Sequence, residues 1–315
     1  MFDVVAVDMG GTNLRAAYFP TQEPEPAAQR KIPTQAHEGP EAVLQRLVSL
    51  IRDVAPAGHT TLRVGVAAPG PLDPRRGMVY GAPNLPGWHA VPLRDRLAEA
   101  LGCLVYVGND ANLGAIGEWR HGAGRGVENL MYLNIGTGIG AGVIADGRLL
   151  LGARGLAAEL GHMTVEPEGP VCGCGLRGHL EAVASGPALA RQALERVQAG
   201  EPSSLVSDIR SGKHVGGTDV GVAAQAGDPL ALDIVIRAGE AIGRHLASLV
   251  HAFNPEVIVL GGGVSTLGPI LLDPMERMLK AQLMSPAYIE GLRLVPAALG
   301  DDAGLIGAMV LAREM

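Results

Sequence analysis

The stretch Asp8-Met9-Gly10-Gly11-Thr12-Asn13 lies between two short runs with the composition of β-strands, residues 4–7 and 14–19. Apolar and β-branched residues dominate both runs, and the adjacent glycines between them favour a tight turn. We therefore expect a β-hairpin with a glycine-rich tip at the start of the chain.

The same order of elements occurs a second time. Residues 130–135 form an apolar run, Gly136-Thr137-Gly138-Ile139-Gly140 follows, and residues 141–144 are apolar again. A strand, a glycine–threonine turn and a second strand are thus predicted twice, which suggests two related lobes facing a shared cleft.

Strands and helices alternate through the rest of the chain. The pattern predicts helices at 41–54, 93–101, 110–120, 228–253 and 303–312, and strands at 62–67, 104–107, 257–260 and 292–295. Residues 21–33 are proline-rich and read as a loop or short meander. This alternation indicates an α/β protein.

Composition excludes several classes of protein. A chain of 315 residues with 47% hydrophobic content is long enough for two domains with buried cores. A net charge of −7 and a pI near 5.7 argue against nucleic acid as a partner. The N-terminus lacks the pattern of a signal peptide, and the apolar runs are too short to span a membrane. We therefore expect no membrane association and a cytoplasmic location.

Three glycine-rich segments have the composition of phosphate-binding loops: Gly10-Gly11-Thr12, Gly136-Thr137-Gly138 and Gly261-Gly262-Gly263. Glycine lets backbone N–H groups approach phosphate oxygens closely. Asp8 adds a carboxylate for Mg²⁺ or its waters, and Thr12 adds a hydroxyl. Any one such segment is equally well explained as an ordinary tight turn, but three together favour a nucleotide site.

These segments and several others, in this order, resemble the ROK family of sugar kinases and repressors, and most closely its bacterial glucokinases. The matching residues are Asp8 to Arg15, Ala68-Pro69-Gly70, Pro83 to Trp88, Asn109 to Asn112, Gly136 to Gly140, Glu159 to His162, and Cys172 to Glu181. The resemblance implies the two-lobed actin-like ATPase fold, a duplicated ribonuclease H-like fold with ATP and sugar in the cleft between lobes. It also implies a homodimer or higher homo-oligomer, with residues 1–108 and 297–315 forming the small lobe and 109–296 the larger one.

The resemblance also assigns roles to residues. Asp110 corresponds to the general base that accepts the proton of the sugar hydroxyl, although on its own it reads as a helix N-cap. The positions that correspond to sugar contacts are Asn109, Asp110, Glu159, His162 and Glu181, with Asn84 and Gly70 as additions. The positions that correspond to ATP and Mg²⁺ binding are Asp8, Gly10, Gly11, Thr12, Asn13, Gly136, Thr137, Gly138, Gly261, Gly262 and Gly263.

A structural Zn²⁺ is the last implied ligand, and here the chain departs from the family. The usual third cysteine is replaced in Cys172-Gly173-Cys174-Gly175-Leu176-Arg177-Gly178-His179 by His179. Histidine is a good zinc ligand, so His162, Cys172, Cys174 and His179 make a Cys₂His₂ set. Because an imidazole holds zinc farther from the backbone than a thiolate, we expect the loop to shift. The alternative is a tight turn with His179 on the surface.

The sequence therefore predicts an ATP-dependent hexose kinase that phosphorylates the 6-hydroxyl of glucose. Gly70-Pro71 stands where N-acetylmannosamine kinases of the family carry Gly-Arg, which favours glucose over N-acetylglucosamine, N-acetylmannosamine or fructose. A non-catalytic or regulatory ROK-type sugar-binding protein is the second alternative, but a repressor's helix-turn-helix has no room before Asp8. A chaperone-type ATPase would leave the segment from Glu159 to Glu181 unexplained.

Overall fold

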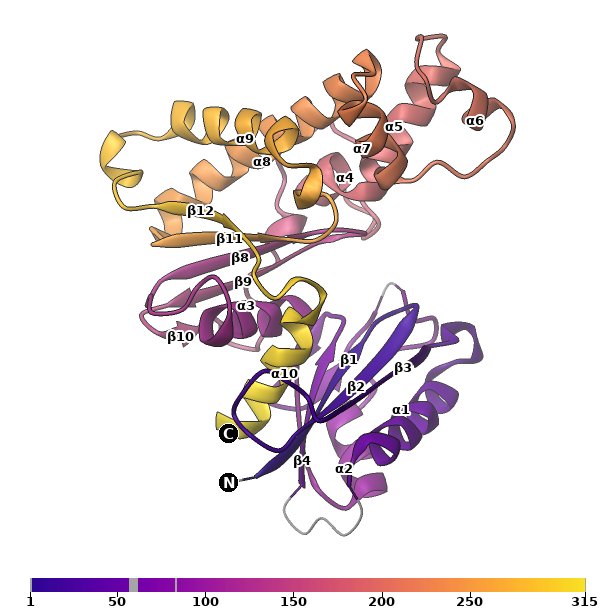
Figure 1. The fold of residues 1–315 in the computed structure, drawn as a ribbon, viewed down its shortest axis with the longest axis vertical. Helices are drawn as coiled ribbons and strands as arrows, with labels where there is room; N and C mark the ends of the chain where they lie inside the picture. Colours follow the sequence, from indigo (N-terminus) through magenta and orange to yellow (C-terminus); the bar gives the residue numbers. More distant parts are fainter. Residues whose placement is uncertain (1, 57–61, 83, 315) are drawn as a thin grey trace. The chain divides into compact units, whose positions relative to one another are not determined.

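The computed structural model describes residues 2–56, 62–82 and 84–314, and contains two five-stranded sheets (Figure 1). The first sheet consists of β1 (Asp3–Met9), β2 (Asn13–Phe19), β3 (Ala28–Pro33), β4 (Leu62–Ala68) and β7 (Leu104–Asn109). The second consists of β8 (Leu130–Ile135), β9 (Ile139–Ala145), β10 (Arg148–Leu149), β11 (Val257–Gly261) and β12 (Arg293–Pro296). A small ribbon of β5 (Leu72–Asp73) and β6 (Met78–Val79) accompanies them.

The two sheets have the same strand order. The first runs β3-β2-β1-β4-β7 and the second β10-β9-β8-β11-β12, so each places its own strands in the order third, second, first, fourth, fifth. Both predicted hairpins are present, and β1 and β2 pair antiparallel from Val4 opposite Phe19 to Met9 opposite Leu14. The repeated strand-turn-strand pattern in the sequence thus marks a structural duplication.

Parallel pairing in the first sheet gathers polar residues at one edge. β4 pairs parallel with both β1 and β7, placing Asp8 beside Ala67, and Ala68 beside Asn109. Because parallel strands end at the same edge, the segments after them emerge together. The carboxyl edge of the first sheet therefore carries Asp8 and the Asn109-Asp110 pair.

Helices cover both faces of the first sheet. Helices α1 (Pro40–Val54) and α2 (Leu93–Leu101) lie on one side of it and α10 (Ala303–Glu314) on the other (Figure 1). Alternate residues of β1, including Val5 and Val7, join the core under α1 and α2, as the two-residue period of a strand requires. On the opposite side, a Cβ at Gly65 would lie 1.9 Å from the Ala308 carbonyl oxygen, so only glycine permits the close approach of α10.

The other helices follow α3 (Asp110–His121) in the chain. They are α4 (Leu180–Ala184), α5 (Gly186–Gln198), α6 (Val206–Arg210), α7 (Gly217–Gln225), α8 (Pro229–Phe253) and α9 (Pro269–Gln282). The predicted apolar stripe of α8 is buried and packs mainly against α9, with α7, α5 and α4 also in contact. In the described parts of the chain no helix has both the length and the apolar character that crossing a bilayer requires.

The chain forms two compact units. Unit 1 comprises Met1–Tyr132, Gly142–Ala158 and Ala297–Met315, and unit 2 comprises Leu133–Ala141 and Glu159–Pro296. The C-terminal segment thus packs with the N-terminal part of the chain, and α3 belongs to unit 1 because it packs closely against α10. The lobes 1–108 with 297–315 and 109–296, drawn from the sequence, have different bounds and stay a prediction.

Candidate functional site

The hairpin tip after Asp8 is held by backbone and side-chain bonds. The Gly10 N–H donates to the Asn13 carbonyl oxygen at 2.9 Å, closing the turn. Buried Thr34 donates its hydroxyl to the Gly10 carbonyl at 2.6 Å and its N–H to the Thr12 carbonyl at 2.9 Å. Thr12 itself stays exposed. The tip is therefore a fixed loop with exposed polar groups, and Thr34 is a supporting residue that the motif analysis missed.

Asn84 lies directly against this loop. A Cβ at Gly11 would lie 2.6 Å from the Asn84 Cβ, so the two backbones touch only because residue 11 is glycine. The loop predicted to bind nucleotide and the asparagine predicted to bind sugar are thus neighbours within unit 1. Gly70 follows β4 at the carboxyl edge of the same sheet. Pro83 of the matched motif lies outside the described residues.

The Asn109-Asp110 pair forms the junction between β7 and α3. The Asn109 Oδ1 accepts the N–H groups of Ala111 at 3.0 Å and Asn112 at 3.1 Å, so Asn109 is the N-cap of α3. Asp110, the first helical residue, is exposed, and its Oδ1 accepts the Ala111 N–H at 2.8 Å. Asparagine rather than aspartate is therefore the N-cap of α3, and the exposed Asp110 carboxylate follows it at the first helical position.

Acidic groups from the C-terminal segment also reach Asp8. Burial raises the pKa of the Asp8 carboxyl, Arg15 opposes this rise, and the charges of Asp301 and Asp302 add to it. Arg15 donates to the Asp301 carbonyl oxygen at 2.8 Å and forms an ion pair with the Asp302 carboxylate. Asp301 and Asp302 are site residues that sequence reasoning missed, although an acidic pair just before a helix is a recognisable signal.

In unit 2, two of the predicted phosphate loops meet. The Val264 N–H donates to the Ile135 carbonyl at 2.9 Å, and a Cβ at Gly262 would lie 2.4 Å from the same oxygen. Gly262 also has a φ of +83°, which favours glycine. The loops at residues 136–138 and 261–263 are therefore neighbours, with Thr137 and Gly263 at their exposed tips.

Glu181 links these loops to the zinc motif. Its Oε2 accepts the Ile139 N–H at 3.0 Å, just beyond Gly138, and its Oε1 accepts the Cys172 thiol at 3.4 Å. Glu159 and His162 lie nearby on the turn Leu160–His162. Desolvation raises the pKa of the Glu159 carboxyl; the charge of His162 lowers it and that of Glu181 raises it. The three predicted sugar ligands of unit 2 thus form one electrostatic cluster.

The four predicted zinc ligands converge. Their ligand atoms all lie within 4.8 Å of one another, with His162 Nδ1 3.6 Å from Cys172 Sγ and His179 Nδ1 3.3 Å from Cys174 Sγ. Standard zinc bond lengths and a tetrahedral angle give a sulfur–nitrogen separation of roughly 3.6 Å. His179 is buried, so the alternative of a surface histidine is wrong. Nδ1 is one bond closer to the backbone than Nε2, which limits the loop shift expected for an imidazole.

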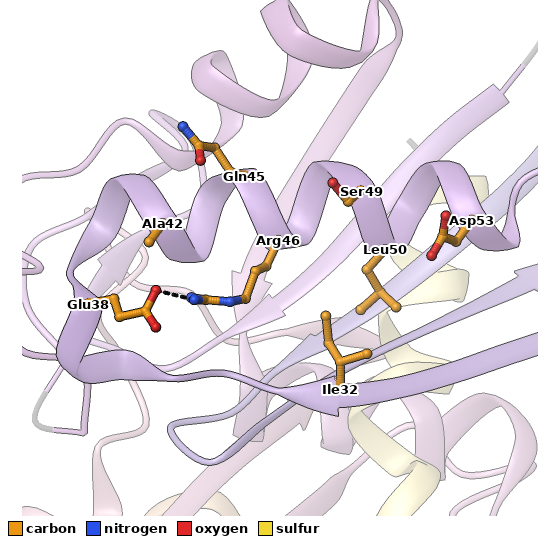
Figure 2. Close-up of a pocket in the computed structure, with 8 residues that line it drawn as sticks. All are labelled: Ile32, Glu38, Ala42, Gln45, Arg46, Ser49, Leu50 and Asp53. Atoms are coloured by element: carbon orange, nitrogen blue, oxygen red, sulfur yellow. Dashed lines mark hydrogen bonds and ion pairs between the residues drawn. The ribbon is translucent and has the colours of Figure 1, made fainter.

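A groove of about 280 Å³ lies elsewhere in unit 1, between α1 and β3 (Figure 2). Arg46 and Glu38 point toward one another across it and form an ion pair, and Asp53 and Leu50 line its far end. It contains none of the predicted site residues, so it is not a candidate for the chemistry.

Comparisons with known proteins agree with this geometry. The ROK family matches residues 4–315. The chain belongs to the ROK family. It is 38% identical over 311 residues to a glucokinase of Thermotoga maritima, covering 99% of this chain and 97% of that protein.

Two solved structures are similar over nearly the full chain. A ROK hexokinase from Thermus thermophilus is 39% identical with a TM-score of 0.82, covering 99% of this chain and 98% of that one. A ROK family glucokinase from Streptomyces griseus in complex with glucose and AMPPNP is 33% identical with a TM-score of 0.83, covering 99% and 100%. Together with the duplicated sheets, these ROK structures confirm the predicted actin-like fold class.

Proposed function

We propose that this ROK protein is an ATP-dependent hexose kinase that phosphorylates the 6-hydroxyl of glucose. The observation that carries the proposal is the placement of Asp110, an exposed carboxylate at the carboxyl edge of the sheet that also carries Asp8. The glucokinase of Thermotoga maritima and the Streptomyces griseus structure with glucose and AMPPNP support the choice of glucose and ATP.

Asp110 is the proposed general base. In the transfer, the sugar hydroxyl oxygen forms a bond to the terminal phosphorus of ATP, the bond from that phosphorus to the bridging oxygen of ADP breaks, and Asp110 takes the hydroxyl proton. The N-terminus of α3 provides a positive potential that favours the ionised carboxylate before transfer. Because Asn109 already caps the helix, Asp110 is not required for that structural task.

The glycine-rich loops supply the nucleotide site in this proposal. The loop carrying Gly10, Gly11, Thr12 and Asn13 would contact the phosphates. The joined loops 136–138 and 261–263 would contact the nucleotide. Asp8 would hold Mg²⁺ or its waters, and the cation would neutralise charge on the phosphate oxygens.

In this proposal hydrogen bonds recognise the sugar, because only 3% of the residues are aromatic and few rings are present to stack on it. Glu159, Glu181 and His162 would pair with hydroxyls, and Asn84 and Gly70 would add contacts. The amide oxygen of Asn109 is already used by Ala111 and Asn112, so its NH₂ group remains to donate to a hydroxyl.

We also propose that His162, Cys172, Cys174 and His179 hold a structural zinc ion. Two of the sulfur–nitrogen distances, 3.6 and 3.3 Å, are close to the roughly 3.6 Å of tetrahedral coordination, and two thiolates with two imidazoles are a donor set that zinc prefers. The ion would join the turn that carries His162 to the start of α4, which carries Glu181. Self-association into a homodimer stays a prediction.

A panel of hexoses assayed with ATP and Mg²⁺ tests the substrate. We expect glucose to give the highest kcat/KM among glucose, N-acetylglucosamine, N-acetylmannosamine and fructose. A different preferred sugar would overturn the choice of glucose, and ATP hydrolysis that needs no sugar would overturn the assignment as a kinase.

Replacing Asp110 tests the mechanism. Asp110→Asn keeps the shape and the acceptor for the Ala111 N–H but cannot take a proton, so kcat should fall about 10²–10⁴-fold. Binding of ATP should be retained. Asp95→Asn, an exposed aspartate in the first turn of α2, is the matched control and should leave kcat unchanged. Near-normal turnover of folded Asp110→Asn would remove Asp110 from the mechanism.

A further inference from the structure

Glu118 is a fully buried carboxylate on α3, two turns after Asp110. Its Oε1 accepts the Leu299 N–H at 2.8 Å, and its Oε2 accepts the N–H groups of Ala298 at 3.1 Å and Ala123 at 2.8 Å. A buried charge is stable only when its oxygens are satisfied, and here three backbone donors satisfy them. Glu118 thus ties α3 to the segment that precedes α10.

We call residues 297–304, which include the first two residues of α10, the crossing segment. It carries Asp301 and Asp302, whose charges act on Asp8, and it ends at Gly304. A Cβ at Gly304 would lie 3.8 Å from the Asp110 carbonyl oxygen and 3.9 Å from the Asp8 Oδ1. The end of the crossing segment therefore lies close to the Asp110 backbone and to the Asp8 carboxylate.

Buried Tyr132 provides independent evidence of this proximity. Burial raises the pKa of its hydroxyl, and the charges of Glu118, Asp110 and Asp301 raise it further. One side chain thus lies within electrostatic reach of all three carboxylates. Two attachments fix the crossing segment: Glu118 holds residues 298 and 299, and Arg15 holds residues 301 and 302.

We infer that Glu118 is a positioning residue for phosphoryl transfer. Through the crossing segment it holds Asp301 and the first turn of α10 against Asp8 and Asp110, without contacting substrate. This inference rests on the proposed roles of Asp8 and Asp110. Transfer needs its groups held within a fraction of an ångström, and a displacement of about 1 Å lowers turnover on the order of 10²-fold.

Glu118→Gln tests the inference. It keeps the side-chain volume but directs an NH₂ group at backbone donors, which releases one end of the crossing segment. We expect hydrogen exchange at Ala298 and Leu299 to rise roughly 10-fold or more. We expect kcat to fall on the order of 10²-fold, and KM for glucose to stay within about twofold, because none of the three backbone groups that Glu118 accepts belongs to a proposed sugar contact. Glu118→Asp keeps both acceptors and should recover part of kcat.

Leu47→Ala is the matched control, since Leu47 is fully buried in α1, which covers the opposite face of the first sheet from α10 (Figure 1). If Leu47→Ala lowers the melting temperature as much as Glu118→Gln does, its kcat should still equal that of the wild type. Normal turnover of Glu118→Gln with raised exchange would overturn the inference, as would an equal loss of kcat in Leu47→Ala. If Glu118→Gln does not fold, the same comparison is made with Glu118→Asp. Phosphorylation of glucose by the wild type is measured first, which tests the proposed function by itself. Hydrogen exchange tests whether Glu118 holds residues 298 and 299, and it does not depend on activity.

Discussion

Removing His179 from the metal cluster is the most direct test of how this chain departs from its family. His179 is buried, its Nδ1 lies 3.3 Å from Cys174 Sγ, and it is the N-cap residue of α4. Its side chain makes no capping hydrogen bond, so His179→Ala removes a metal ligand without removing a cap. We expect the purified variant to lose zinc, whereas the wild type should contain near one zinc per chain.

The size of the effect follows from what the ion connects. Zinc would close the chain between His162 and His179, a loop of roughly 15–20 residues. A cross-link of that length stabilises by about 3 kcal/mol in the chain-entropy estimate. For a chain of 315 residues that corresponds to a melting temperature lower by roughly 5 °C. Part of kcat should also be lost, because Glu181 follows the site directly and holds the Ile139 N–H.

Metal analysis and thermal melting measure both consequences. His179→Cys restores a ligand and should retain zinc. His214→Ala removes an exposed histidine outside the cluster and should change neither metal content nor melting. Wild-type protein that is free of metal yet fully active and equally heat-resistant would refute the zinc site.

Three further predictions concern single carboxylates. Asp8→Ala should abolish phosphoryl transfer but leave glucose binding measurable by calorimetry; loss of glucose binding with ATP binding intact would contradict this. Glu159→Gln should raise KM for glucose roughly 10-fold or more in steady-state assays, since hydrogen bonds to charged groups contribute about 1.5–3 kcal/mol; an unchanged KM and kcat would make the residue structural. Burial alone would raise the pKa of Asp228, but bonds from Ala231 and Ser204 hold it at about 2, below 3.8. The ionised Asp228 carboxylate therefore adds about 2 kcal/mol to the free energy of unfolding above pH 4, and this contribution is lost as pH falls toward 2. Asp228→Asn should therefore weaken the pH dependence of the unfolding free energy in this acid range.

Local sequence signals were sufficient for most strands of the two large sheets and for most helices in contact with them, but not for the two-residue strands β5, β6 and β10. The glycine-rich turns and the apolar runs located β1, β2, β8 and β9, and the meander allowed for residues 21–33 contains β3. Helix α2 begins and ends where its pattern predicts, because Gly102 adopts the left-handed conformation that ends it.

No helix is predicted between residues 159 and 227 or at α9. Helices α4 and α6 have five residues each, too few to show an apolar period, and α5 and α7 begin with glycine, which is a poor helix former. Helix α9 contains Pro274, which in a sequence reads as a break. In these segments packing against α8 outweighs local preference.

The sequence motifs located the residues that would contact ligands, but they did not locate the residues that hold those ligand-contacting residues in place. Thr34, Arg15 and Asp302 act across long sequence separations, and no local pattern links Arg15 to a segment near the C-terminus. The zinc ligands were predictable because three of them lie within eight residues of one another.

Helix α3 shows why the two kinds of residue differ. Asp110 and Glu118 are carboxylates on the same helix, yet one is exposed at its N-terminus and the other is fully buried in its last turns. An exposed carboxylate exchanges protons and ligands readily, as a general base must. A buried one that accepts three backbone N–H groups is fixed in place, so its contribution is the position of the chain it holds. Asn109 caps the helix and Glu118 holds the crossing segment, so these two residues carry the structural roles, and the proposed proton transfer is assigned to Asp110.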